Sequence, residues 1–160
     1  MGKHYGKIFE EDIKASFPEG VYVERYKDDT AGFRGVDNPA DFRVYKFPFT
    51  FLIECKSHKG KSLPLSKIRK SQIDGLSKAV KYTGIHGGFF INYRDYAETY
   101  YVPVDLLERF ISAGSRKSIP VEWCRLWGQR IEQKKKITRY SYDLEKWLEG
   151  VYNGTKREIK

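Results

Sequence analysis

The chain has 160 residues, of which 40% are hydrophobic and 32% are charged. Its mean hydropathy is −0.64, and no apolar run approaches the ~20 residues that cross a bilayer, which excludes a helical membrane protein. The hydrophobic content excludes a disordered chain. We therefore predict one globular domain over residues 1–160, with a basic and disordered tail over 152–160.

The charge and the aromatic content indicate a class of partner. The chain holds 30 Lys and Arg against 21 Asp and Glu, a formal net charge of +9, together with 12 Tyr and 10 Phe. This composition favours a polyanion, nucleic acid above all. Charge alone also fits an acidic substrate or an anionic membrane surface, but no basic amphipathic helix supports the membrane, so we expect no membrane partner.

The cysteines and the N-terminus indicate the compartment. Cys55 and Cys124 are too few for a disulfide framework and suit a reducing cytosol. The first residues carry no apolar signal segment. We therefore predict a cytoplasmic location.

A first helix is predicted over residues 6–16, because apolar residues recur at four-residue spacing from Phe9 and a proline follows. Glu10, Glu11 and Asp12 fall in its early turns, where acidic groups favour the positive end of the helix dipole. This explanation is sufficient for Glu11 and Asp12. Glu10 has a second interpretation, as an extra carboxylate for the site described next.

Alternation with period two predicts strands over 21–26, 41–45 and 49–56, separated by a polar loop over 27–39. In the third strand, alternate side chains share one face. The apolar part of that strand therefore leads directly into a charged end.

Residues 46–49 can close an antiparallel hairpin. Folding the chain at Phe47–Pro48 puts Asp41 opposite Glu54, and Lys56, two positions on, faces the same way. Asp37 is a rival carboxylate, but no strand register aims it. Two carboxylates and a lysine at the open end of a hairpin predict a site for a hard divalent cation.

Glu54 and Lys56 also have a simpler interpretation, as an ion pair on a solvated strand, because Glu-x-Lys triplets are common. The apolar run over 49–53 argues for the metal site. Charged groups rarely follow a core strand without partners.

Two basic segments beyond the hairpin are candidates for phosphate contacts: the loop over 57–64 and the Gly- and Ser-containing loop over 114–120. Backbone N–H, hydroxyl and guanidinium groups suit phosphate oxygens; solvated turns are the alternative. The candidate DNA-binding residues are His58, Lys59, Lys61, Arg116 and Lys117.

The longest helix is predicted over 65–83, with Ser66 as its N-cap and Gly84 after its end. Gln72 lies at the edge of its apolar stripe, either as a satisfied core-edge amide or as a group that points at a substrate phosphate. The remaining predictions are strands over 89–93 and 99–102, helices over 104–113 and 142–152, packed Trp123, Leu126 and Trp127, and a solvated run at 134–136.

Taken in order, these residues resemble a known family. Asp41 followed by Glu54-Cys55-Lys56 resembles the PD-(D/E)XK nuclease core, with one residue inserted between Pro39 and Asp41. Over roughly residues 5–120 the chain is similar to the RecU-type Holliday junction resolvases and their phage-borne relatives. The other segments that carry the resemblance are 6–13, 63–65, 71–72, 87–88, 100–103 and 114–120.

The resemblance implies an α/β chain with the restriction-endonuclease-like fold, a central mixed β-sheet flanked by helices. It also implies a magnesium-dependent homodimer, with Mn²⁺ able to substitute, that nicks four-way DNA junctions in a bacterial cell and is encoded by host or phage. The site residues it implies are Asp41 and Glu54 on the metal, Lys56 as a catalytic residue, and Glu10 and Gln72 as accessory residues. Because magnesium prefers oxygen ligands, we add the backbone carbonyl of Cys55 as a third ligand.

One departure from the family keeps other functions open. Members carry a projecting insertion before the catalytic aspartate, and residues 22–41 are too short for much of one. The alternatives are a PD-(D/E)XK nuclease that cuts flap, nicked or ordinary duplex DNA, and a basic DNA-binding module without chemistry.

Overall fold

The computed structural model of the chain describes residues 4–26 and 40–159. The loop predicted over 27–39, which includes Asp37 and most of the shortened insertion region, lies outside the described residues.

A six-stranded mixed sheet forms the centre of the molecule, in the order β1-β2-β3-β5-β6-β8. The β3–β5 pair is parallel and its other neighbouring pairs are antiparallel. These strands are β1 (Tyr22–Arg25), β2 (Phe42–Lys46), β3 (Phe49–His58), β5 (Ile85–Tyr93), β6 (Glu98–Pro103) and β8 (Gln129–Ile131). Two further strand pairs are β4 (Ser62–Pro64) with β7 (Ser118–Pro120), and β9 (Gln133–Lys135) with β10 (Tyr140–Tyr142).

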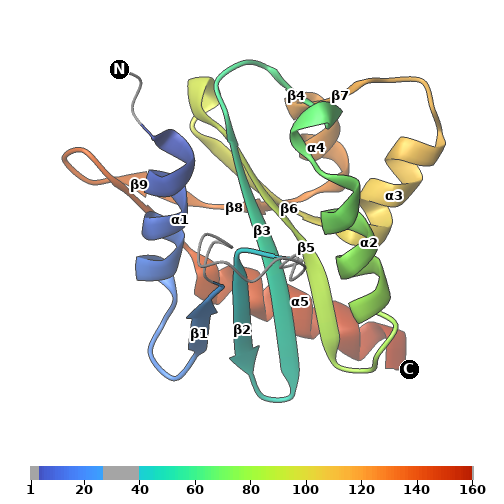
Figure 1. The fold of residues 1–160 in the computed structure, drawn as a ribbon. Coiled ribbons are helices and arrows are strands. Elements are labelled where there is room, and N and C mark those ends of the chain that lie inside the picture. Colours follow the sequence, from blue (N-terminus) through green and yellow to red (C-terminus); the bar gives the residue numbers. More distant parts are fainter. Residues whose placement is uncertain (1–3, 27–39, 160) are drawn as a thin grey trace, which may run out of the picture.

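Helices cover both faces of this sheet (Figure 1). One layer contains α1 (Tyr5–Ser16) and α5 (Leu144–Ile159), and the other contains α2 (Lys70–Ala79), α3 (Val104–Ser112) and α4 (Val121–Trp127). Two short 3₁₀ turns, η1 (Leu65–Lys67) and η2 (Arg94–Tyr96), complete the elements. No helix within the described ranges is long and apolar enough to cross a bilayer.

The alternation of β3 sends its side chains to two separate cores. Phe51 and Ile53 pack in the core covered by α1 and α5, whereas Leu52 packs in the core covered by α2, α3 and α4. At the centre of the first core, the Trp147 ring lies 5.2 Å from Phe51 and 4.9 Å from Phe90, measured between ring centroids. β3 is thus buried on both faces from Phe51 to Cys55.

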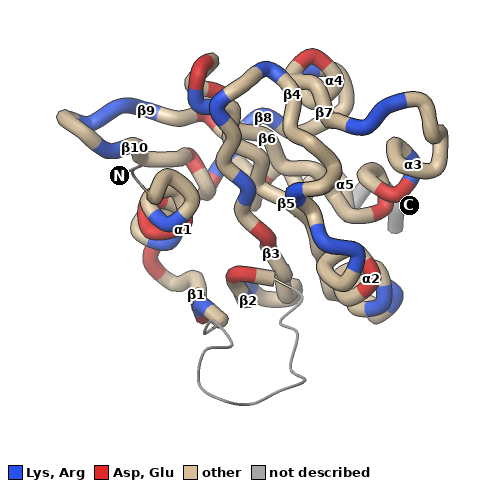
Figure 2. The backbone as a smooth tube through the Cα atoms, turned by 45° about the horizontal axis from the view of Figure 1, so that its top comes forward, with Lys and Arg blue, Asp and Glu red and all other residues tan. Residues whose placement is uncertain are grey.

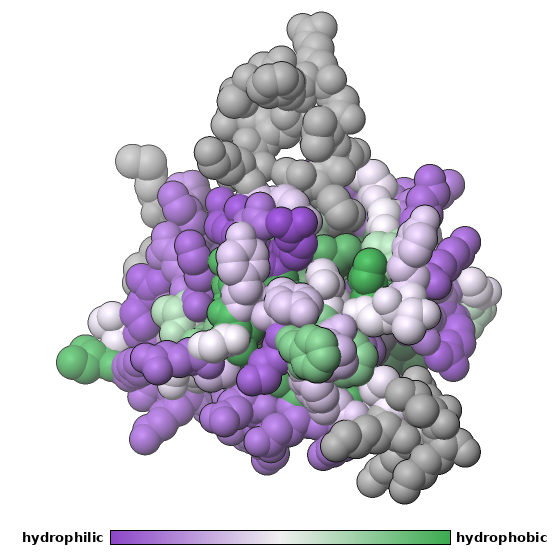
Figure 3. All heavy atoms as spheres, turned by 90° about the horizontal axis from the view of Figure 1, so that it is seen from below, coloured by the Kyte–Doolittle hydropathy of each residue, from purple (hydrophilic) through white to green (hydrophobic). Residues whose placement is uncertain are grey.

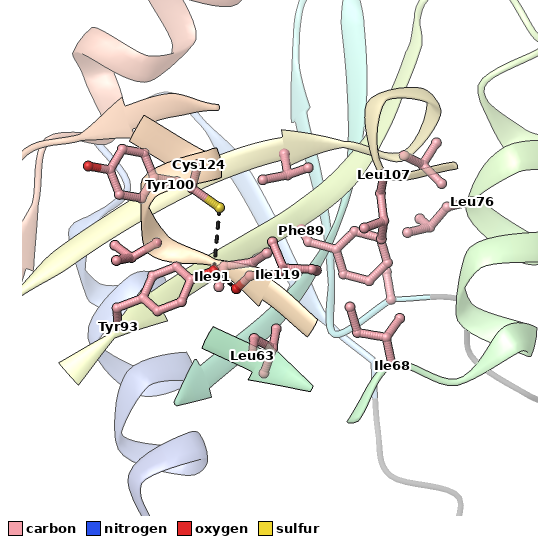
Figure 4. Close-up of a cluster of buried hydrophobic side chains, with 14 of the residues drawn as sticks. Leu63, Ile68, Leu76, Phe89, Ile91, Tyr93, Tyr100, Leu107, Ile119 and Cys124 are labelled. Carbon is pink, nitrogen blue, oxygen red and sulfur yellow. Dashed lines mark hydrogen bonds between the residues drawn. The ribbon is translucent and has the colours of Figure 1, made fainter. Parts of the chain in front are cut away.

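The second core also fixes the β4–β7 pair (Figure 4). The buried Tyr93 hydroxyl donates a 2.8 Å hydrogen bond to the Ile119 carbonyl and lies 3.4 Å from Cys124 Sγ. Burial raises the pKa of the Tyr93 hydroxyl well above its usual range, so it remains a neutral donor. Gly88 allows the backbones of β5 and β6 to approach closely in the same region, because a Cβ at this position would lie 2.5 Å from the Val102 carbonyl oxygen.

The predicted hairpin register is confirmed. Phe42 pairs with Ile53 and Val44 with Phe51, and the turn contains a cis peptide bond at Phe47–Pro48. Viewed from below, the face that carries this turn is largely hydrophilic, with small apolar areas between the polar ones (Figure 3).

The helix predicted over 65–83 is wrong in its boundaries. η1 ends at Lys67, Ile68 turns inward to 7% exposure, and Arg69 is extended (φ −76°, ψ 142°) and caps α2 in place of Ser66. Burying Ile68 in the core interrupts the helical path, and tertiary packing outweighs local propensity here. Gly84 has a positive φ of 87°, but in a turn beyond the helix.

Other predictions also need correction. The final helix is longer than predicted, because α5 continues to Ile159 where a disordered tail was expected. Leu126 and Trp127 are 78% and 63% exposed, although we predicted that they pack. The basic loops over 57–64 and 114–120 contain β4 and β7, which pair with each other.

Candidate active site

Glu54 and Asp41 meet at the point where β2 begins. The hairpin register extends one residue beyond β2, since the Asp41 N–H donates to the Ile53 carbonyl at 3.0 Å. Asp41 Oδ2 in turn accepts a 2.8 Å hydrogen bond from the Cys55 N–H. These two bonds tie Asp41 to the strand that carries Glu54, as the sequence predicted.

The Glu54 carboxylate is held from two sides. Its exposure is only 5%, which rules out a solvated strand face. Oε1 accepts a 2.7 Å hydrogen bond from Gln72 Nε2 and lies 3.2 Å from Lys56 Nζ. The ion pair of the simpler interpretation is therefore present, but it is buried and shared with the Gln72 amide.

Burial makes this pair of carboxylates electrostatically unfavourable without a cation. Desolvation, reinforced by the charge of Glu54, raises the pKa of Asp41 to about 7. Desolvation also raises the pKa of Glu54, although the charge of Lys56 opposes it. A divalent cation would relieve both the repulsion and the cost of burial, so the donor set fits the metal that the family resemblance implies.

Backbone geometry adds a third oxygen on the same side. In a strand the N–H and C=O of one residue point toward the same neighbour, and the Cys55 N–H points to Asp41. The Cys55 carbonyl therefore faces the Asp41 side. Its thiol lies in the core, where burial raises its pKa well above the usual range. Within residues 4–26 and 40–159 no group of three or more His, Cys, Asp and Glu side chains is close enough to hold a metal.

Glu10 on α1 lies close enough for its charge to raise the pKa values of both Asp41 and Glu54. Its Oε2 accepts hydrogen bonds from Arg25 Nε at 3.1 Å and Nη2 at 2.7 Å. The structure therefore brings Glu10 to the site, but with a guanidinium already on its carboxylate. The helix-dipole explanation fails for its neighbours, because no acidic residue lies in the first turn of α1.

The two predicted basic segments are joined by the β4–β7 pair. The Val121 N–H donates to the Lys61 carbonyl at one end of this ladder, and the Leu65 N–H donates to the Lys117 carbonyl at the other, both at 2.9 Å. The side chains of Lys59, Lys61, Arg116 and Lys117 are exposed. His58 ends β3 beside Arg94, and desolvation and then the charge of Arg94 lower its pKa, which favours the neutral imidazole.

Basic residues surround the acidic pair (Figure 2). In that view the acidic segment just before β2 lies beside the one on β3, with Lys and Arg segments farther along β3 and at the start of α2. Sequence reasoning missed two arginines, Arg25 and Arg69. The charge of Arg69 lowers the pKa of Glu54. Neither follows a recognisable motif, and only the packing of α1 and α2 against the sheet brings them here.

Comparisons with known proteins identify a family. The sequence model of the RecU family, described as Recombination protein U, matches residues 44–144. No curated protein matches the chain.

A solved structure supports the fold. The chain is similar to Archaeoglobus fulgidus Hjc, a Holliday junction resolvase from an archaeal hyperthermophile, with a TM-score of 0.53 and 17% sequence identity over 81% of this chain and 95% of that chain. This similarity confirms the predicted restriction-endonuclease-like fold, and the family match covers more than half of the sequence. The chain therefore belongs to the RecU family.

Proposed function

We propose that this protein is a divalent-metal-dependent endonuclease that resolves four-way DNA junctions by paired phosphodiester hydrolysis. The observation that carries the proposal is the convergence of Asp41, Glu54 and Lys56 at one end of the β2–β3 hairpin. The family membership supports the same activity. The surrounding basic residues suit a polyanionic DNA substrate.

In this proposal Asp41, Glu54 and the Cys55 carbonyl hold Mg²⁺, for which Mn²⁺ can substitute. The bound cation would polarise a non-bridging phosphate oxygen and lower the pKa of a water molecule. Gln72 keeps the Glu54 carboxylate oriented through its 2.7 Å hydrogen bond. Lys56, a mobile point charge, orients the nucleophile or stabilises charge that develops on the phosphate.

Further residues have supporting roles in this proposal. Glu10 acts as an accessory carboxylate, and Arg25 offsets its charge. His58, Lys59, Lys61, Arg116 and Lys117 contact the DNA backbone around the site. We expect products with a 5′-phosphate and a 3′-hydroxyl.

We further propose a homodimer, because one site per subunit needs a two-fold assembly to cut two strands of a two-fold junction. An enzyme of recombination works where the DNA is, so we place it in the cytoplasm. Sedimentation with and without junction DNA tests the assembly, and a monomer in both conditions would refute the dimer.

The deciding experiment compares cleavage of a four-way junction, a flap and a linear duplex of matched sequence, each with Mg²⁺ or with EDTA. We expect symmetrical cuts in the junction with Mg²⁺, and none with EDTA or with Glu54→Gln. Equal cutting of the three DNAs would replace the resolvase with a general nuclease. Cutting by Glu54→Gln at the wild-type rate would refute the site.

A further inference from the structure

A cavity of about 370 Å³ lies between α1 and the β9–β10 hairpin, and the mechanism above does not use it. Figure 1 shows α1 and β9 next to each other at one side of the sheet, and Asp12 on α1 accepts a 3.2 Å hydrogen bond from the Tyr140 N–H on β10. This volume is within the ~300–1,000 Å³ typical of small-molecule sites, so a single nucleotide is a suitable size of occupant.

The cavity reaches the catalytic strand. Ser57, which lines it, directly follows Lys56 on β3, and consecutive Cα atoms are only about 3.8 Å apart. Consecutive side chains of a strand point to opposite faces, so Ser57 and Lys56 lie on the two sides of β3. A molecule in the cavity therefore lies across β3 from a phosphate at Lys56. The helix α1 connects the two places, because it lines the cavity and also carries Glu10, whose charge acts on Asp41 and Glu54.

A directional chain of hydrogen bonds runs along one wall. Arg94 Nη1 donates to Ser57 Oγ at 3.1 Å, and that hydroxyl donates to Asn92 Oδ1 at 3.0 Å. Asn92 Nδ2 donates to Thr99 Oγ1 at 3.0 Å, and Thr99 donates to Gln133 Oε1 at 2.7 Å. A guanidinium can only donate, so Arg94 fixes the direction of each following bond.

This direction leaves the cavity rich in donors. Gln133 ends the chain as an acceptor through Oε1, and among the described residues Nε2 has no hydrogen-bond partner. Both oxygens of Asp12, the acidic residue of the lining, already accept bonds, from Arg139 Nε and from the Tyr140 N–H. Arg139 is already paired with both Asp12 and Glu11, whereas Arg94 has no carboxylate partner among the described residues. The cavity therefore suits a ligand with several acceptor atoms and an anionic group beside Arg94.

An aromatic platform stands at the same cavity. The Tyr5 side chain is 45% exposed, and the Arg94 guanidinium carbon lies 4.3 Å from the centre of its ring. Nucleic-acid bases stack on exposed aromatic rings and on guanidinium planes. An acceptor-rich, anionic ligand with a flat aromatic part is a nucleotide.

We propose that this cavity binds one unstacked nucleotide of the cut strand, near the scissile phosphate. The base stacks on the face of the Tyr5 ring that the Arg94 guanidinium leaves open, and Gln133 Nε2 donates to an acceptor on the base. This assignment rests on the proposed function, because it takes the position of the scissile phosphate from Lys56.

The first test combines the removal of a base from the DNA with the removal of the Tyr5 ring from the protein, each alone and both together. Junctions carry an abasic nucleotide at each of the two positions on either side of the cut. We expect abasic DNA at one position to lower wild-type kcat/KM by about tenfold, the range for loss of one stacked base. Tyr5→Ala should lose a similar factor on intact DNA and lose little more on that abasic DNA.

Matched variants separate the cavity from general effects. Tyr82→Ala removes another exposed tyrosine, 70% exposed and outside the cavity lining, and should behave as wild type. Tyr5→Leu keeps apolar cover at the start of α1 and should resemble Tyr5→Ala, which guards against loss of fold.

Gln133→Leu should change the order in which the four bases are preferred at that position. Equal losses from abasic DNA in wild type and Tyr5→Ala at all four positions would overturn the proposal.

The second test does not need cleavage, so it remains decisive if the proposed activity fails. 2-Aminopurine replaces each of the same nucleotides, and its fluorescence is followed as Glu54→Gln binds the junction. We expect a change at one position that Glu54→Gln/Tyr5→Ala lacks. The same signals from both proteins would refute the cavity, whereas a wild type that cuts no DNA would refute only the nuclease. Free deoxynucleoside monophosphates are titrated in parallel, and binding of these without any effect of base removal would overturn the assignment to the cut strand.

Discussion

Gln72 Nε2 donates a 2.7 Å hydrogen bond to Glu54 Oε1 and so links α2 to the catalytic strand. The amide cannot be reversed at this position, because its Oε1 accepts the Arg69 backbone N–H at 3.1 Å. With 3% exposure, Gln72 is locked in place. The first residues of α2 therefore set the orientation of a carboxylate 18 positions earlier in the chain.

Gln72→Leu tests this link. A side chain of similar size without the amide leaves the Glu54 carboxylate less constrained, and we expect Mg²⁺ affinity to fall by about 10- to 100-fold, as for other residues that orient metal ligands. Titration calorimetry measures the affinity. Ser71→Ala, an exposed change on the same helix, is the control. Unchanged affinity in Gln72→Leu would mean that the hydrogen bond only fills the core.

Asp41→Asn, Glu54→Gln and Lys56→Ala should each lower junction cleavage by at least about 100-fold, because each removes a charge that acts on the reacting phosphate. Gel-shift assays should show junction binding within a few-fold of wild type. Asp105→Asn, which breaks an exposed pair with Arg109, is the matched control and should cut normally. Residual cutting by Asp41→Asn near the wild-type rate would exclude Asp41 as a ligand.

The raised pKa of Asp41 predicts two opposite dependences on pH. The folded protein holds this proton up to about pH 7, against 3.8 for an ordinary aspartate. The stability contributed by the protonated group is therefore full below pH 3.8 and is lost as the pH rises through 7. The metal needs the ionised form, so its affinity should rise by up to about tenfold per pH unit below 7.

Thermal unfolding without metal and calorimetric titration with Mg²⁺, both from pH 5.5 to about 8.5, measure these two trends. Asp41→Asn should remove most of the pH dependence of metal-free stability, because it cannot ionise. A metal affinity that is flat across this range would contradict the raised pKa.

Asp12 anchors the β9–β10 hairpin to α1 through its bonds to Arg139 Nε at 2.8 Å and to the Tyr140 N–H at 3.2 Å. Asp12→Ala leaves that backbone donor unpaired, and we expect a loss of about 1–3 kcal/mol in the free energy of unfolding by urea. The exposed pair Asp105–Arg109 offers a comparison, because removing it should cost at most about 1 kcal/mol. Equal losses at both sites would contradict the anchoring role.

The basic β4–β7 segments should act through the DNA backbone. Lys59→Ala/Lys61→Ala should weaken binding to junctions of any sequence and reduce the slope of log K against log salt by about one for each phosphate that the variant no longer neutralises. Lys78→Ala/Lys81→Ala changes the net charge equally, on exposed residues at the far end of α2. If both pairs reduce the slope alike, net charge rather than local binding of phosphates explains the affinity.

The sequence alone was sufficient to predict the hairpin and its carboxylates. A period-two pattern on both sides of Phe47–Pro48 allows one register that keeps Val44 and Phe51 on the same side, and this register also places Asp41 opposite Glu54. The helical pattern placed Gln72 at the edge of the buried face, although the start of that helix was wrong, but it did not predict the hydrogen bond to Glu54. Local patterns of this kind are encoded within about 20 residues.

The remaining contacts could not be predicted, because they join distant segments that share no pattern. Asp12 and Arg139 are 127 positions apart. The hydrogen bonds that run from Arg94 to Gln133 depend on the pairing of β3 with β5 and of β5 with β6. The sequence predicts a helix at Ile68 because its neighbours favour one. The packing of its side chain in the core, which ends that helix, is visible only in three dimensions.

Trp147 fills the centre of one core, yet it lies on α5, the last helix of the chain. During synthesis the strands of the sheet, which end at Ile131, leave the ribosome before this helix does. The nascent chain therefore passes through a stage in which the Phe51 and Phe90 rings face water. Such a surface invites association between neighbouring polypeptides on a polysome, and it disappears only when translation supplies the indole that covers it.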